Sequence, residues 1–306
     1  MNWISKPCLL PRLCLTLALA ALTAIQTVQA APVVLKDDAG QTVRLAAPAK
    51  RIVSLAPHLT ENLYAAGAGD KLVGTVDYSD YPEAAKKLPR VGGYSKLNLE
   101  AIAALKPDLV VAWESGNAGG HIAKLRALGI PVYLSQPNRI DDVARTLEAL
   151  GHLAGTERVA NAAAARYRQR LGELRHRYST LPRVRTFYEI WQQPLMTVGG
   201  GQIISDVIHL CGGENVFANL QQLAPKVTVE AVLATNPEVI AASGMGDSRP
   251  EWLDDWKRWD KVTAVARGNL FFVPPDLIQR HTPRLLEGAA RLCADLETAR
   301  QRRPAH

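Results

Sequence analysis

The chain has 306 residues and a formal net charge of +7, with 36 Lys and Arg against 29 Asp and Glu. This length is sufficient for two domains of ordinary size. The basic residues are spread along the chain, and the short runs at 166–170 and 300–303 are typical of a solvated helix face and a terminal tail. Because nucleic-acid binding requires a basic patch with a reading element, we exclude nucleic acid as a partner.

Residues 1–30 have the pattern of a secretory signal peptide. Lys6 and Arg12 come first, an apolar stretch follows at 13–25, and small residues at Val28 and Ala30 predict cleavage after Ala30. The apolar stretch is short for a membrane span of roughly 20 residues, so a retained anchor is the less favoured alternative. Cleavage removes two basic residues and no acid, which lowers the net charge from +7 to +5.

Export determines how the four cysteines are interpreted. Cys8 and Cys14 leave with the signal peptide, whereas Cys211 and Cys293 remain. Two cysteines in an exported protein most simply form one disulfide. Two buried free thiols are the alternative, since free Cys is often simply buried. Neither cysteine has other metal-ligand residues at zinc spacing, so we predict no metal site.

The first part of the mature chain alternates strands with helices. It begins with a hairpin at 32–45, and a strand at 51–55 then leads to a helix at 62–66, for which Thr60 is the predicted N-cap. Asn98 is the predicted N-cap of a further helix. The remaining elements are strands at 72–74, 109–112 and 131–134 and helices at 99–105 and 119–128. This alternation predicts a mainly parallel sheet that is covered on both faces.

The middle of the chain is helical by its apolar spacing. Gly155 and Thr156 divide residues 141–180 into two helices, and Thr156 is the predicted cap of the second. That helix, at about 157–179, would be roughly 35 Å long. The second alternating part then has a strand at 184–190, a helix at 203–210, a strand at 270–273 and a helix at 283–299.

These elements predict an α/β fold with two Rossmann-like lobes, joined by one long rigid helix and separated by a ligand cleft. The expected boundaries are a signal peptide at 1–30, an N-terminal lobe at 31–140, linking helices at 141–182 and a C-terminal lobe at 183–306. No flexible Ser, Gly or Pro linker joins the lobes, so we expect little hinge closure.

A local pattern that occurs twice supports the two lobes. Glu100 and Glu230 are each followed seven residues later by Pro, then by an acid, then by an apolar run. Asn98 and Thr228 are predicted N-caps, which places both glutamates in the first turn of a helix. A charge that offsets the helix dipole is one explanation. The recurrence of the glutamate in both lobes favours a second explanation, in which a single partner contacts both lobes.

Several aromatic and charged residues follow predicted strands. In open α/β sheets ligands bind beyond the carboxyl ends of the strands; a place in the core is the alternative for each aromatic. Trp252, Trp256 and Trp259 have helical spacing and are interpreted as packing or surface residues. The candidate ligand-binding residues are Tyr78, Tyr94, Trp113, Trp191, His58, Asp276 and Arg280. Asp276 and Arg280 are four residues apart and can pair with each other.

Catalysis has little support. Ser205, Asp206 and His209 do not form a nucleophile elbow, and the glycines at 199–201 are not a phosphate loop. The seven histidines are scattered without metal-ligand spacing. We therefore predict no catalytic residue and no enzymatic activity.

The chain resembles the cobalamin, siderophore and haem group of periplasmic substrate-binding proteins, which are the soluble components of ABC importers. The resemblance covers nearly the whole mature chain. It is closest to the cobalamin branch, on Tyr78 to Pro82 and on the Ala-Trp pair that ends at Trp113. The segments that carry it are 51–55, 78–82, 98–113, 211–217 and 276–280.

The resemblance implies a role for each candidate residue. Tyr78, Tyr94, Trp113, Trp191, Asp276 and Arg280 would lie at or near the ligand. Tyr94 stands where the cobalamin branch has Trp, and Ala224 stands where it has another cleft Trp, so one contact is lost. Glu100 and Glu230 match acids that dock onto arginines of the importer permease, and Cys211 and Cys293 match a family disulfide.

The expected function is therefore capture of cobalamin in the periplasm and its delivery to an ABC importer, by a monomer without a cofactor of its own. Haem or a ferric siderophore is the alternative ligand, for which His58 or Tyr94 would be the iron ligands. His209 is not expected to ligate cobalt, because residues 206–212 lack the motif of base-off corrinoid enzymes.

Overall fold

The computed structural model describes residues 1–3, 31–93, 96–246 and 248–304, so most of the predicted signal peptide and Tyr94 lie outside the described residues. The described chain contains one hairpin and two four-stranded parallel sheets. The strands are β1 (Val33–Lys36), β2 (Thr42–Leu45), β3 (Ile52–Ser54), β4 (Leu72–Thr75), β5 (Leu109–Trp113), β6 (Val132–Ser135), β7 (Val184–Glu189), β8 (Gly213–Asn215), β9 (Val239–Ala242) and β10 (Leu270–Phe272).

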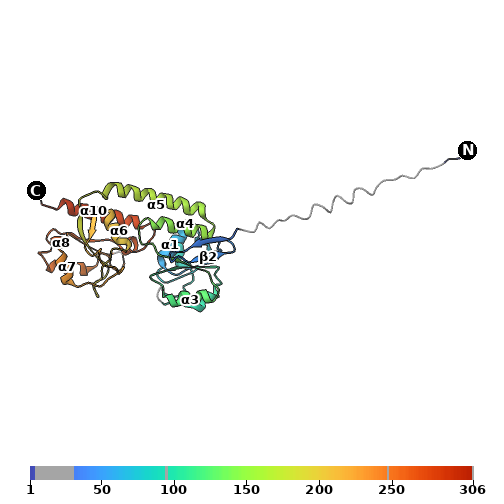
Figure 1. Cartoon of the computed structure of the whole chain (residues 1–306), viewed down its shortest axis with the longest axis horizontal. Coiled ribbons are helices and arrows are strands. Elements are labelled where there is room, and N and C mark those ends of the chain that lie inside the picture. Colours follow the sequence, from blue (N-terminus) through green and yellow to red (C-terminus); the bar gives the residue numbers. More distant parts are fainter. Residues whose placement is uncertain (4–30, 94–95, 247, 305–306) are drawn as a thin grey trace.

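Helices connect the strands and cover the sheets (Figure 1). The α-helices are α1 (Pro57–Ala65), α2 (Leu99–Ala104), α3 (Gly119–Ala127), α4 (Asp142–Ala154), α5 (Glu157–Tyr178), α6 (Ile203–Leu210), α7 (Val229–Thr235), α8 (Thr263–Ala266), α9 (Pro275–Ile278) and α10 (Leu285–Gln301). Short 3-10 helices are η1 (Gly69–Lys71), η2 (Glu83–Lys87) and η3 (Glu251–Arg258). In the part of the chain that the structure describes, none of these helices combines the length and the apolar character needed to span a membrane.

The two sheets have the same topology. The first has the strand order β4-β3-β5-β6, and the second, when it is traced from its opposite edge, has the order β8-β7-β9-β10. Each strand of the first lobe thus has a counterpart in the second, with β3 matching β7 and β5 matching β9. The helices α2 and α7 precede the matched strands β5 and β9. The duplicated unit predicted from the sequence is therefore confirmed, and so is the α/β fold.

The helix α5 connects the lobes along one side of the molecule (Figure 1). Its 22 residues correspond to roughly 33 Å. It packs against the other linking helix, α4, against α1 of the first lobe, and against α6 and α10 of the second. The predicted connection by one long helix is confirmed, whereas the exact lobe limits at 140 and 183 stay a prediction.

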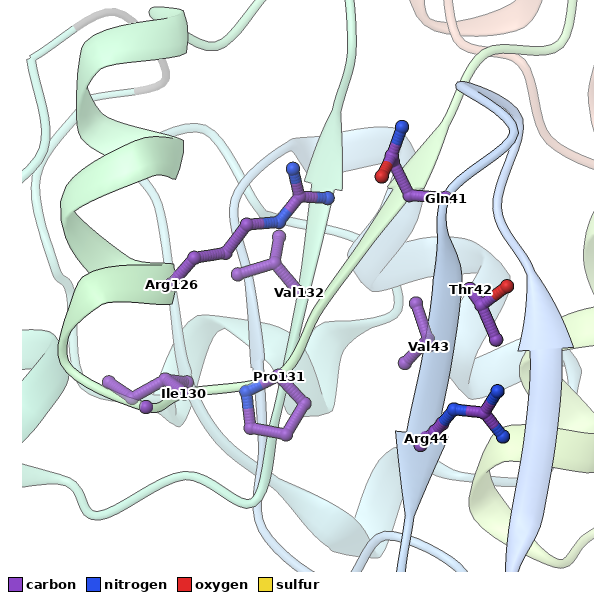
Figure 2. A pocket seen from close by; sticks show the side chains of 9 residues that line it. Gln41, Thr42, Val43, Arg44, Arg126, Ile130, Pro131 and Val132 are labelled. Atoms are coloured by element: carbon purple, nitrogen blue, oxygen red, sulfur yellow. The ribbon is translucent and has the colours of Figure 1, made fainter.

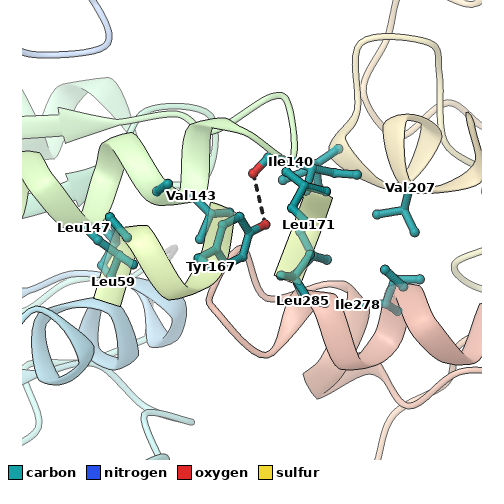
Figure 3. Packing of buried hydrophobic residues seen from close by; sticks show 14 of the residues in the cluster. Leu59, Ile140, Val143, Leu147, Tyr167, Leu171, Val207, Ile278 and Leu285 are labelled. Atoms are coloured by element: carbon teal, nitrogen blue, oxygen red, sulfur yellow. Dashed lines mark hydrogen bonds between the residues drawn. The ribbon is translucent and has the colours of Figure 1, made fainter. Parts of the chain in front are cut away.

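One apolar core extends beneath this helix from lobe to lobe (Figure 3). The same buried cluster contains Leu59 of the first lobe, Leu147 and Leu171 of the linking helices α4 and α5, and Ile278 and Leu285 of the second lobe. A buried tyrosine ties α5 to the segment before α4, because the Tyr167 hydroxyl donates a hydrogen bond of 3.0 Å to the Ile140 carbonyl. Continuous packing of this kind makes the junction between the lobes stiff.

Three helix ends form as their residues predict. The side chain of Asn98 accepts a hydrogen bond of 2.9 Å from the backbone N–H of Ala101 at the start of α2. Thr228 accepts one of 3.2 Å at the start of α7. Gly155 ends α4 in the left-handed conformation, with a φ of 66° that glycine adopts without steric cost.

One predicted cap is in the wrong place, and another holds its position without a capping hydrogen bond. The first helix starts at Pro57 rather than after Thr60, because proline is favoured in the first helical turn. Thr60 therefore lies inside α1, where its buried hydroxyl is within 2.6 Å of the Thr75 hydroxyl. Thr156 precedes α5, but its side chain makes no capping hydrogen bond.

The predicted disulfide is confirmed, and the alternative of two free thiols is wrong. Cys211 follows α6 and Cys293 lies in α10, with an S–S distance of 2.08 Å and a Cα–Cα distance of 4.6 Å. Both residues are fully buried. The bond therefore joins two helices inside the second lobe.

Candidate functional site

A cavity of about 280 Å³ lies between residues of the two lobes. Trp113 at the end of β5 and Gln136 just after β6 contribute to it from the first lobe, and Ile190 just after β7 contributes from the second. These positions are the carboxyl ends of parallel strands, where open α/β sheets bind ligands. The other lining residues are Ser115, Pro137, Asn138, Gln202, Ile203, Ile204, Leu223, Ala224, Gln279 and His281.

The inner part of this cavity is aromatic and uncharged. Trp113 packs edge to face against His58, with ring centroids 5.2 Å apart, and His281 lies 5.4 Å from His58. Burial lowers the pKa of His281 to about 4. Burial, then the charges of His281 and Arg280, also lower the pKa of His58 well below its usual value. Both imidazoles are therefore neutral at neutral pH, and His58 packs against Trp113 rather than lining the cavity.

Arg280 connects the lobes at one side of the cleft. Its guanidinium lies 2.6 Å from Asp80 Oδ1, 3.0 Å from Asp276 Oδ1 and 3.4 Å from the Tyr78 carbonyl. The Arg280 side chain is only 14% exposed. The predicted pairing of Asp276 with Arg280 is confirmed, and Arg280 also contacts the backbone of Tyr78.

A second arginine makes a parallel contact four residues later. Arg284 donates two hydrogen bonds, of 2.8 and 2.7 Å, to the two carboxylate oxygens of Glu61 in α1. Its guanidinium also lies 3.8 Å from the centroid of the Tyr81 ring. We call Glu61, Tyr81 and Arg284 the interlobe clasp. Sequence analysis missed it, because Glu61 and Arg284 are 223 positions apart.

The remaining predicted ligand residues lie at the surface or outside the described chain. Tyr78 is 73% exposed and has a φ of 62°, which is unusual for a bulky residue. Trp191 is partly exposed, and its indole N–H donates a hydrogen bond of 2.8 Å to the Gln193 carbonyl. Ala224 is confirmed as a cavity residue. Tyr94 lies outside the described residues.

Sequence analysis also missed most of the polar lining. Gln136 follows a strand at its carboxyl end, so the rule that selected Trp113 would also have found it. Gln202 is at the start of α6, whereas Gln279 and His281 follow the short helix α9. No sequence pattern marks these three positions, because their place in the cleft depends on how the lobes pack.

Glu100 and Glu230 occupy equivalent places in the two lobes. Both are exposed in the first turn of the matched helices α2 and α7. The backbone N–H of Glu230 and then the Thr228 hydroxyl bind its carboxylate and lower its pKa. Each glutamate therefore presents a carboxylate to solvent at the positive end of a helix.

The second acid of each repeat has a structural role instead. Asp108 accepts hydrogen bonds of 2.8 and 3.0 Å from the backbone N–H groups of Lys50 and Arg51 before β3. Its counterpart Glu238 accepts one of 3.4 Å from Arg185 in β7. These bonds fix the start of each matched strand and explain why an acid recurs after the proline. Hydrogen bonds to the start of a strand do not explain why Glu100 and Glu230 recur.

A larger hollow of about 370 Å³ shares no lining residue with the cleft cavity and has a different character (Figure 2). It lies between β2 and the corner that connects α3 to β6. Arg126, which points into it, is 3.4 Å from the carboxylate of Asp37. Across the described ranges, no three His, Cys, Asp or Glu side chains are grouped to hold a metal ion.

Comparison with known proteins identifies the family to which this chain belongs. Residues 52–277 match the periplasmic binding protein family, and the chain belongs to this family. The Vitamin B12-binding protein of Vibrio cholerae is 40% identical over 255 residues, which are 83% of this chain and 91% of that protein. The Vitamin B12-binding protein of Yersinia pestis is 40% identical over 248 residues, or 81% of this chain and 86% of that protein.

Solved structures agree with the family. The crystal structure of the periplasmic vitamin B12 binding protein BtuF of Vibrio cholerae has a TM-score of 0.77 at 40% identity, and the match covers 83% of this chain and 99% of that one. A periplasmic heme binding protein from Pseudomonas aeruginosa has a TM-score of 0.68 at 26% identity, over 80% of this chain and 92% of that one. The two curated relatives are thus vitamin B12-binding proteins, and the two solved structures are of periplasmic binding proteins.

Proposed function

We propose that the protein captures cobalamin in the periplasm and delivers it to an ABC importer. The observation that carries this proposal is the neutral cavity between the lobes, with Trp113 on one side and the amides of Gln136, Gln202 and Gln279 around it. The flat corrin ring of cobalamin can pack against an aromatic side chain, and the amide groups at its edge can bind a few polar side chains. The similarity to vitamin B12-binding proteins at 40% identity supports the same ligand.

The size of the cavity agrees with a ligand that is only partly enclosed. Its volume of about 280 Å³ is smaller than roughly 300–1,000 Å³, the usual range for drug-sized ligands, and cobalamin exceeds that size. The ligand would therefore extend beyond the cavity to Tyr78 and Trp191, which are exposed, and to Asp276 and Arg280. Tyr94 completes the proposed set.

Calorimetric titration with cyanocobalamin tests this proposal. We expect one site per chain and an affinity that falls about tenfold in Trp113→Leu, since aromatic contacts contribute about 0.5–1.5 kcal/mol beyond their buried area. Trp252→Leu, outside the cleft cavity, is the matched control and should bind normally. Absence of binding at high micromolar cyanocobalamin would refute the proposal. A Soret shift with haem that His58→Ala abolishes would favour the haem alternative instead.

We further propose that Glu100 and Glu230 dock onto basic residues of the importer permease, one from each lobe. Their exposure and their matched positions on α2 and α7 support this role. Reversal of both to Lys should abolish cobalamin uptake by cells and leave cyanocobalamin affinity unchanged. Reversal of two exposed acids of α5, Glu157 and Glu173, is the matched control. Uptake that survives in the Glu100 and Glu230 double variant would show that these acids only offset helix dipoles.

The remaining expectations belong to the same proposal. The signal peptide is cleaved after Ala30, and the protein acts as a monomer without enzymatic activity or a cofactor of its own. The disulfide between Cys211 and Cys293 supports an oxidising compartment. N-terminal sequencing of the exported protein should begin at Ala31, and any other start would move the proposed cleavage site.

A further inference from the structure

A third pocket, of about 230 Å³, lies within the C-terminal lobe. We call it the indole pocket, because the side chains of Trp252, Trp256 and Trp259 line it together with Glu189. Its other lining residues are Gln192, Gln193, Leu195, Val229, Asp255 and Arg258. None of them lines the cleft cavity. Because successive side chains of a strand point to opposite faces, Glu189 at the end of β7 faces this pocket while Ile190 faces the cleft.

Glu189 is a deeply buried acid in the wall of this pocket. It is 1% exposed, and its Oε2 accepts a hydrogen bond of 2.7 Å from the indole N–H of Trp256. Within the described ranges no salt bridge involves Glu189. Burial raises the pKa of Glu189 to about 7, and the nearby charge of Asp255 acts in the same direction. A buried carboxylate without a cation is costly, so a positive group next to it would be stabilised.

The tryptophans provide a surface that suits such a cation. Trp256 and Trp259 lie with ring centroids 5.2 Å apart and ring planes tilted by 47°. The guanidinium of Arg258 already stacks 5.0 Å from the centroid of the Trp259 ring. Since its side chain is 62% exposed and its pairing with Asp255 is long, at 3.4 Å, Arg258 remains at the rim and does not neutralise Glu189. Indole faces attract cations through their quadrupole.

We propose that the indole pocket is a second binding site, distinct from the cleft, and that it takes a small protonated alkylamine. The ammonium group donates hydrogen bonds to the carboxylate of Glu189, and the alkyl part contacts Trp252 and Trp259. The volume fits a ligand smaller than a drug-sized molecule. Anions are repelled by Glu189 and Asp255, whereas a neutral apolar molecule leaves the buried carboxylate without compensation.

This site makes a specific prediction about pH. The alkylamine is bound by ionised Glu189, so binding takes a proton off this carboxyl group, whereas the amine itself stays protonated because its pKa is near 10. With a pKa of about 7 for Glu189, the ionised fraction rises about tenfold between pH 6 and pH 8, and affinity should rise by the same factor. Asp255 and Arg258, both on η3, are the other charged residues that line the pocket.

Titration of the purified protein with butylammonium, followed by tryptophan fluorescence and calorimetry, tests the proposal. Glu189→Gln removes the charge but keeps an oxygen that accepts the Trp256 hydrogen bond, and it should weaken binding at least tenfold at pH 8. Asp295→Asn is the matched control, because Asp295 is a partly buried acid of α10 whose pKa burial also raises to about 7, and it lies outside the pocket. This variant should bind normally.

Three results would overturn the proposal: no saturable signal with butylammonium, equal binding of butanol, or unchanged affinity in Glu189→Gln. If circular dichroism shows that Glu189→Gln does not fold, two other measurements test the proposal. They are the pH dependence of binding by the unaltered protein and the binding affinity of Trp259→Leu. An affinity that does not rise with pH, or that Trp259→Leu leaves intact, also refutes the site. Cyanocobalamin binding should be the same in Glu189→Gln, which separates this site from the cleft.

Discussion

The interlobe clasp should contribute more to stability than an exposed ion pair of the same chemistry. Glu61 and Arg284 form a bidentate pair, and their side chains are only 3% and 17% exposed. The change Glu61→Gln leaves the largely buried guanidinium of Arg284 with a neutral partner. Removal of one partner from a buried pair costs about 3–5 kcal/mol, and the residual exposure of Arg284 places the cost near the lower end, at about 3 kcal/mol.

Thermal unfolding by far-UV circular dichroism measures this cost. At about 2 °C per kcal/mol for a chain of this size, Glu61→Gln should lower Tm by about 6 °C. The chain offers a matched control in Glu148 and Arg168, which also form a two-bonded pair but are 35% and 50% exposed. Glu148→Gln should cost less than about 1 kcal/mol. Equal shifts in the two variants would refute the argument that burial decides the strength of the clasp.

Two further predictions concern pH and the disulfide. Burial lowers the pKa of His281 from 6.5 to about 4, so its contribution to stability is present above pH 6.5 and is lost as the pH falls, by about 3 kcal/mol at pH 4. The free energy of unfolding, measured by chemical denaturation, should therefore depend less on pH below 6.5 in His281→Asn. An unchanged pH dependence in this variant would contradict the prediction. The disulfide spans 82 positions. The double change Cys211→Ser and Cys293→Ser should lower the free energy of unfolding by about 4 kcal/mol, because the unfolded chain loses a constraint. An unchanged Tm would refute this prediction.

Local signals in the sequence predicted the repeat and its caps correctly. Asn98 and Thr228 have side chains that satisfy the first N–H groups of a helix, and they do so in the structure. The same reasoning failed at Thr60, because Pro57 already starts the helix. Its hydroxyl belongs instead to a buried polar cluster with Ser54, Thr75 and Ser79. That cluster depends on the pairing of β3 with β4, which no local pattern encodes.

The residues of the candidate site likewise fall into those that local sequence predicts and those that it does not. Trp113 ends β5 and Gln136 follows β6, so the position of strand ends is enough to find them. Arg280 was found, but its contact with Asp80 was not, because the partners are 200 positions apart in different lobes. His281 and Glu61 were missed for the same reason. Helix caps and strand ends follow from local sequence, whereas strand pairing within a lobe and contacts across the cleft depend on how distant segments pack.

The core beneath α5 has a consequence for folding. The two sheets match strand for strand, so each half has the plan of an independent domain. However, Leu59, Leu171 and Leu285 belong to one buried cluster that crosses the boundary. A single half expressed alone would expose that apolar face to water and lose its burial energy. The duplicated halves have thus become mutually dependent, and the molecule should unfold in one cooperative transition rather than lobe by lobe.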